Sequence, residues 1–263
     1  MPLQLIEGQY APGDPICPEL STDDRASAQA FYSELFDWTF EEVEGRTRAL
    51  KADRMAAGIG LMEGLDLAGP RWWICLAAPD LEDLVDRVEP SGAISRPMGL
   101  EGLGRAAVLE DPAGAKAVLW QPDRLEPGAL GATHGGLVWS DLVVDDPSGV
   151  AGFYERLFDL EAAPVDDRST SQGRATIGLV RRELEVPRMV VGIIPASESS
   201  SSAEVGARWR PYFQVDDLEE FLRAAERTGA SVSETRTSAS RRAFAVLSDP
   251  QGAEFGVVAA GPG

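Results

Sequence analysis

The sequence predicts an α+β fold made of two tandem copies of one domain, and in each copy the order strand, helix and three strands occurs twice. Three landmarks carry this prediction, because each returns in the same order roughly 120–140 residues later. They are Asp24 with Phe31-Tyr32 and Leu35-Phe36 (again at Asp146, Phe153-Tyr154 and Leu157-Phe158), Arg71-Trp72 before Asp80-Leu81-Glu82 (again at Arg208-Trp209 before Asp217-Leu218-Glu219), and Asp111-Pro112 with Gly114 (again at Asp249-Pro250 with Gly252).

The first copy opens with a short strand over 15–20 and a helix. The helix has apolar residues at helical spacing, and Asp23 or Asp24 is placed to cap its start. Short strands with glycine turns follow, such as 55–62. A second unit then repeats the order, with a strand over 72–77, a helix over 80–88 and strands near 106–110 and 115–120. The second copy begins with a strand over 137–143, so the chain holds four βαβββ units.

Domain boundaries follow from the repeat and from composition. We expect an N-terminal domain over 1–125 and a C-terminal domain over 133–263, joined near the glycine- and proline-rich stretch 122–136. The serine run 197–203 lengthens the second copy and is typical of a surface loop.

Charge and cysteine content exclude several classes of function. The chain has 24 basic against 43 acidic residues, a formal net charge of −19. Such a surface repels nucleic acid and anionic membranes, since binding to either depends on Lys and Arg. Two cysteines, Cys17 and Cys75, are too few for a disulfide framework or a zinc cluster. No signal peptide or membrane-spanning run is evident, so we expect a cytoplasmic protein.

The ordered, duplicated landmarks resemble those of the vicinal oxygen chelate superfamily, which includes glyoxalase I, extradiol dioxygenases and bleomycin-resistance proteins. The resemblance covers nearly the whole chain. The sequence is similar in particular to the tandem two-domain glyoxalase-like proteins of actinobacteria that are often labelled hydroxylases. It implies that each domain is a cupped mixed β-sheet with flanking helices. A fold of this kind does not by itself fix a function.

The resemblance also implies where a metal would bind, because metal-using members place His or Glu at fixed strand positions. Counted from the landmarks, these positions hold no histidine or carboxylate. They hold Cys17, Trp73 and Val118 in the first copy and Trp139, Arg210 and Gly256 in the second. We therefore expect no metal and no other cofactor. One alternative remains, in which Glu19, Asp141 and Glu254 hold a metal.

The inward faces of the cups should then bind an organic ligand. Side chains two apart on a strand share a face, which places Glu19 beside Cys17 and Asp141 beside Trp139. We expect ligand contacts from mostly apolar and aromatic walls with a few polar groups. The expected ligand-binding residues are Cys17, Trp73, Lys116, Trp120, Trp139, Arg210, Tyr212 and Glu254.

Glu19 and Asp141 are the candidate catalytic residues. A carboxylate in an apolar cup has a raised pKa and can act as a general acid or base. The alternative is that each pairs with a neighbour, such as Lys116 or Arg210, and only stabilises the sheet. Trp72, Trp209 and the helix phenylalanines should instead lie in the core, and His134 is expected on the polar surface of the linker.

Two functions of different classes remain open at this point. The first is a metal-independent binding protein that encloses an aromatic or hydrophobic natural product, for sequestration or resistance. The second is a cofactor-independent enzyme of secondary metabolism, such as a cyclase, isomerase or hydrolase, that uses pocket carboxylates. Tandem fusion is compatible with either a monomer or a homodimer.

Overall fold

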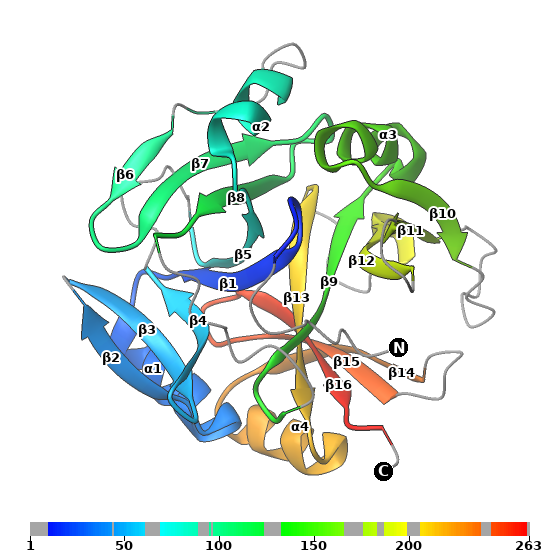
Figure 1. Ribbon diagram of the computed structural model, residues 1–263. Helices are drawn as coiled ribbons and strands as arrows, with labels where there is room; N and C mark the ends of the chain where they lie inside the picture. The colour runs from blue at the N-terminus through cyan, green and yellow to red at the C-terminus, as the bar shows by residue number, and fades with distance from the viewer. Residues whose placement is uncertain are drawn as a thin grey trace.

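The computed structural model contains two eight-stranded mixed sheets (Figure 1). It describes residues 10–43, 45–60, 69–88, 95, 97–123, 133–165, 176–182, 187–198, 206–237 and 243–261. The expected strand end at 61–62, most of the expected linker and most of the serine run lie outside these residues.

The first sheet comes from the first half of the chain, in the order β2-β3-β4-β1-β5-β8-β7-β6. Its central strands β1 and β5 run antiparallel, and each pairs in parallel with the last strand of its own unit, β4 or β8. The elements are β1 (Pro15–Ser21), α1 (Arg25–Phe36), β2 (Thr39–Val43), β3 (Arg46–Lys51), β4 (Arg54–Ile59), β5 (Arg71–Ala77), α2 (Leu81–Val88), β6 (Met98–Leu100), β7 (Gly104–Glu110) and β8 (Lys116–Gln121).

The second sheet repeats this topology in the order β10-β11-β12-β9-β13-β16-β15-β14. The prediction of an α+β protein with four βαβββ units is therefore confirmed. The elements of the second copy are β9 (Leu137–Val144), α3 (Pro147–Phe158), β10 (Glu161–Val165), β11 (Thr176–Arg181), β12 (Arg188–Pro195), a 3₁₀ turn (Ala196–Glu198), β13 (Arg208–Val215), α4 (Leu218–Arg227), β14 (Ser231–Thr237), β15 (Ala243–Ser248) and β16 (Glu254–Ala259).

The first helix of each copy begins and ends in the same way. Asp24 and Asp146 cap the starts, where their carboxylates accept backbone N–H groups of the first turn. Asp37 and Asp159 end the helices in the left-handed region, at φ 53 in each case. Asp tolerates that conformation better than most residues, so the repeated Asp after Leu-Phe marks the helix end.

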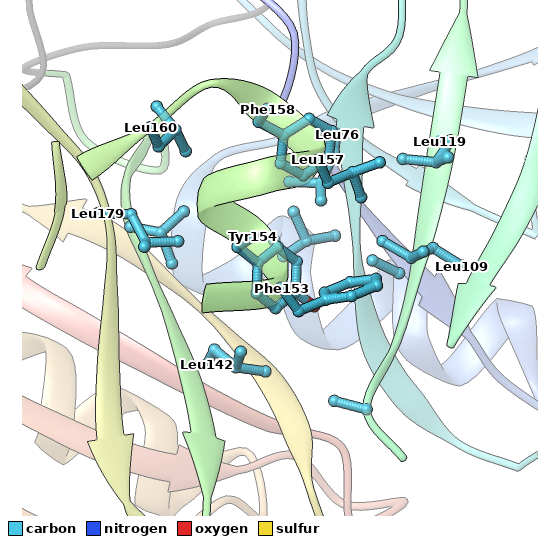
Figure 2. Packing of buried hydrophobic residues seen from close by; sticks show 14 of the residues in the cluster. Leu76, Leu109, Leu119, Leu142, Phe153, Tyr154, Leu157, Phe158, Leu160 and Leu179 are labelled. Carbon is cyan, nitrogen blue, oxygen red and sulfur yellow. The ribbon is translucent and has the colours of Figure 1, made fainter. Parts of the chain in front are cut away.

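The core is shared between the two sheets. Helices α2 and α3 lie together at the top of Figure 1, and α1 and α4 lie together at the bottom. One hydrophobic cluster joins β5, α2, β7 and β8 of the first copy to β9, α3, β11 and β12 of the second. Figure 2 shows this packing around Phe153, Tyr154 and Leu157, with Leu76, Leu109 and Leu119 facing them from the first copy. A second cluster joins α1 to α4 and the strands around them.

The repeated landmarks meet across this junction. Tyr32 donates a hydrogen bond to Asp249 (3.0 Å), and Tyr154 donates one to Asp111 (3.0 Å). Burial raises the pKa of both tyrosines and of both aspartates, because it penalises their charged forms. The Phe-Tyr and Asp-Pro-x-Gly landmarks therefore connect one copy to the other.

Trp72, Trp209 and the four helix phenylalanines are buried in these clusters, as predicted. The Trp72 indole donates a hydrogen bond to the Tyr32 hydroxyl (3.0 Å).

The expected surface position of His134 is wrong. Its ring is half-buried and lies edge-on to Phe36 and Phe221. Nε2 donates to the Leu35 carbonyl (2.9 Å) and Nδ1 accepts the Asp216 N–H (3.3 Å). The helix end that it contacts is distant in sequence, which is why the linker composition suggested an exposed residue.

None of the helices in the described part of the chain has the length and apolar character needed to span a bilayer.

Candidate functional site

The inner faces of the two sheets turn away from the shared core, and we refer to them as the first cup and the second cup. In the first cup, Glu19 lies between Gly58 of β4 and Trp73 of β5 in the strand register. One row further along, Cys17 lies opposite Cys75, and Cys75 lies beside Val118 of β8. The first cup therefore brings most of its predicted residues into two neighbouring rows.

Apolar side chains fill much of the first cup. Cys17, Cys75 and Trp120 belong to one buried cluster that also contains Met55 and Val118. The Trp120 indole donates to the Leu103 carbonyl (2.9 Å). The predicted ligand contacts Cys17 and Trp120 thus pack against protein.

The other predicted residues of the first cup divide between its interior and its rim. Glu19 and Trp73 are buried, at 1% and 3% exposure, and the guanidinium of Arg71 lies 5.4 Å from the centre of the Trp73 ring. Lys116 lies at the start of β8 and pairs with Glu110 (3.7 Å).

The second cup has a different character, because its corresponding rows carry polar groups. Asp141 occupies the row of Gly192 on β12 and Arg210 on β13. Trp139 lies one row away, opposite Tyr212, and Tyr212 lies beside Gly256 of β16. The second cup thus brings together five predicted site residues. They are Trp139, Asp141, Arg210, Tyr212 and Glu254, the last of which lies at the start of β16.

Trp139 and Asp141 form one part of this site. The Trp139 indole donates to Asp141 Oδ1 (2.6 Å), and both side chains lie over Gly192. A Cβ on Gly192 would come within 2.5 Å of that oxygen. The Trp139 ring is half-buried, whereas Asp141 is only 8% exposed. Trp139 therefore offers an aromatic surface next to a buried carboxyl group.

Arginines and Glu254 form the other part. Arg210 Nε donates to Glu254 Oε1 (2.8 Å), and Arg208 donates to both oxygens of the same carboxylate (2.9 and 3.2 Å). Arg210 also donates to the Tyr212 hydroxyl (3.2 Å). The Tyr212 ring packs closely against Gly256, where a Cβ would approach the ring to 2.1 Å.

The surroundings of Asp141 and Glu254 shift the pKa values of these two carboxyl groups in opposite directions. Burial raises the pKa of Asp141, although hydrogen bonds from Trp139 and Tyr212 and the charge of Arg210 oppose the shift. For Glu254, burial acts upward but the adjacent Arg210 and Arg208 outweigh it, so the pKa is lowered. Glu254 is thus the ionised partner of the arginines, and Asp141 is the carboxyl group more easily protonated.

The residues present do not fit the metal that the family implies. A hard cation needs free oxygen or imidazole donors. Glu254 is bonded through both oxygens to arginines, and Asp141 accepts from Trp139 with the Arg210 charge nearby. No group of three potential ligand residues clusters in the parts of the chain that the structure describes.

Sequence reasoning missed two features of the second cup. Arg208 shares a face with Arg210 and binds Glu254, and its spacing two residues from Arg210 was the available signal. Gly192 and Gly256 form the floor beneath Asp141 and Tyr212. Those roles depend on cross-strand register, which a single sequence does not reveal.

Comparison with known proteins agrees with this architecture. Residues 139–258 match the family described as "Glyoxalase-like domain". CFP32 of Mycobacterium tuberculosis, a glyoxylase by name, is 30% identical over 97% of this chain and 97% of its own length. The anthracycline biosynthesis protein DnrV of Streptomyces peucetius is 30% identical over 95% and 94%. The chain therefore belongs to the glyoxalase-like family of the vicinal oxygen chelate superfamily.

Solved structures share the fold at lower identity. The 2,3-dioxygenase LapB of Pseudomonas sp. KL28 aligns with a TM-score of 0.63 and 15% identity over 96% of this chain and 94% of its own. The Mn(II)-bound glyoxalase of Novosphingobium aromaticivorans aligns at 0.59 with 14% identity, over 95% and 83%. At these identities the likeness concerns the fold alone.

Proposed function

We propose that this protein binds a planar aromatic natural product in its second cup without a metal ion, and so acts in the biosynthesis of, or resistance to, such a compound. The proposal rests on the side chains that stand where the family resemblance implies metal ligands. The second cup has Trp139, Tyr212 and Gly256 in one row, and its nearby carboxylates are bonded to protein donors.

The chemistry of the second cup supports an aromatic ligand that carries oxygen. Trp139 presents a half-buried ring for stacking, which contributes ~0.5–1.5 kcal/mol beyond area burial in aromatic pairs. Asp141 and Arg210 supply an acceptor and a donor beside that ring. Two relatives named for anthracycline biosynthesis are consistent with a polycyclic quinone.

Fluorescence titration of the chelator-treated protein tests this proposal. A panel of planar quinones, beginning with an anthracycline, should quench the intrinsic tryptophan emission of the wild type at saturable, low concentrations. Trp139→Ala should weaken binding about tenfold, equivalent to ~1.4 kcal/mol. Trp120→Phe is the matched control, because Trp120 packs in the first cup, and it should bind like the wild type. Equal binding by Trp139→Ala and the wild type would remove the second cup from the proposal.

A second candidate function is a cofactor-independent enzyme that uses Asp141 as a general acid or base. The raised pKa of Asp141 beside Tyr212 and Arg210 favours it, since acid–base catalysis needs a carboxyl group that exchanges protons near the working pH. Incubation of each panel compound with the protein, followed by mass spectrometry, would detect turnover. In this case Asp141→Asn should abolish turnover while quenching persists.

A further inference from the structure

The two cysteines of the chain face each other inside the first cup. Cys17 on β1 and Cys75 on β5 are direct register partners in an antiparallel pair, and both are buried and free. Directly opposed residues in such pairs have Cα atoms about 4.5–5.5 Å apart. A disulfide spans Cα separations of about 4.4–6.8 Å, a range that includes the spacing expected for directly opposed cysteines.

The two thiols also share one buried environment. The Cys17 thiol donates a hydrogen bond to the Pro18 carbonyl (3.2 Å), and burial, with the neighbouring Cys17 adding to it, raises the pKa of the Cys75 thiol. Apolar residues such as Met55 and Val118 surround the pair. The corresponding row of the second cup carries Trp139 and Tyr212, so this arrangement belongs to the first cup alone.

We infer that Cys17 and Cys75 form a redox-active dithiol, which a small uncharged oxidant such as hydrogen peroxide converts to an intramolecular disulfide. Peroxide oxidises one thiol to a sulfenic acid and leaves as water. The second sulfur then attacks the first, the S–S bond forms, and a second water is released. Two thiols lose two protons and two electrons, and one peroxide is reduced to two waters.

The surroundings favour the closed product once it forms. A disulfide is uncharged and suits the apolar cluster, whereas burial raises the pKa of the Cys75 thiol by penalising the thiolate. Closure therefore proceeds more slowly than for an exposed thiol. The bond would join β1 to β5 and close a loop of roughly 60 residues, which restricts the unfolded chain. This inference is independent of the ligand proposed for the second cup.

Peroxide treatment of the full chain, followed by denaturation, alkylation and mass spectrometry, tests the inference. We expect a species that lacks two hydrogen atoms and takes up no alkylating reagent, with one peptide pair cross-linked through Cys17 and Cys75. Reduction should restore two alkylated cysteines. Since the chain has only these two cysteines, the assignment is unambiguous.

Single variants supply the control. Cys17→Ser and Cys75→Ser should each show one alkylated cysteine and no cross-link after the same treatment. Two alkylatable thiols in the treated wild type would overturn the inference, as would a sulfinic acid at either position or a bond between two chains. A parallel sample of a free-thiol peptide shows that the oxidant is active.

Discussion

Single residues determine the shape of the second cup, and the glycines of its floor do so most directly. The Tyr212 ring packs closely against Gly256 because that residue has no side chain, and Asp141 has the same relation to Gly192. The family resemblance implies a metal-binding side chain at the position of Gly256, whereas here the Tyr212 ring takes that space. The replacement of an implied metal ligand by the Tyr212 ring is therefore a local change.

Replacing Gly256 with Ala should disrupt this floor. The new Cβ would lie 2.1 Å from the Tyr212 ring, so the ring and the Arg210 contact must shift. We expect a loss of ~1–3 kcal/mol in the free energy of unfolding, as for an overpacked core. Urea unfolding measures this loss in the free energy of unfolding. Gly99→Ala is the control, because a Cβ at Gly99 meets nothing within 4 Å. Equal stability of the two variants would contradict the account.

The protonation of Asp141 should appear in the pH dependence of stability. Burial raises the pKa of Asp141 in the fold above its ordinary value of 3.8, so between the unfolded and folded pKa values the native state binds more protons than the unfolded state. The contribution of Asp141 to the free energy of unfolding should therefore fall as the pH rises through that window. Unfolding of wild type and Asp141→Asn across mildly acidic pH measures it. An Asp141 contribution that rises with pH would show that its pKa is lowered.

At the scale of elements, the sequence predicted much of the fold because helix starts and turns are local. Asp24 and Asp146 cap helices, and the Asp-Pro-x-Gly turns join strands at the expected places. Strand register was not accessible in this way. Trp73 was counted with Cys17, but the register places it opposite Glu19. Alternation along a strand predicts which residues share a face, whereas the partners across strands depend on the register.

The cap of α3 offers a test at this scale. Asp146 accepts the backbone N–H groups of Ser148 and Gly149 (3.1 Å each). Asp146→Ala should cost ~1 kcal/mol in the free energy of unfolding, because those donors lose their partner. The neighbouring exposed Asp145 is the matched control, and Asp145→Ala should change stability by less than ~0.5 kcal/mol. Calorimetric or urea unfolding compares them, and an equal cost at both positions would contradict the capping role.

For the whole molecule, the main feature is that the two largest hydrophobic clusters are shared between the copies. Both large hydrophobic clusters contain residues from both sheets, and Tyr32 and Tyr154 donate across the junction. His134 adds a contact of the same kind. The linked copies thus give each other the apolar surface that helix faces require.

Separated halves should therefore fail to fold as stable monomers. A chain of residues 133–263 alone would expose the faces of α3 and α4 that the first copy covers. We expect it to self-associate or aggregate on size-exclusion chromatography and to form a well-folded species when produced together with residues 1–125. Cooperative unfolding of each half as a monomer would show that the copies are independent.

The central claim, a ligand site that works without metal, is tested most directly by one measurement. Elemental analysis of the purified protein should be paired with quinone titration before and after exhaustive chelation. We expect less than stoichiometric metal and the same dissociation constant in both samples, because we propose that Trp139, Asp141 and Arg210 contact the ligand themselves. A stoichiometric divalent metal whose removal abolishes binding would contradict it, and would return the site to the metal-using chemistry of its structural relatives.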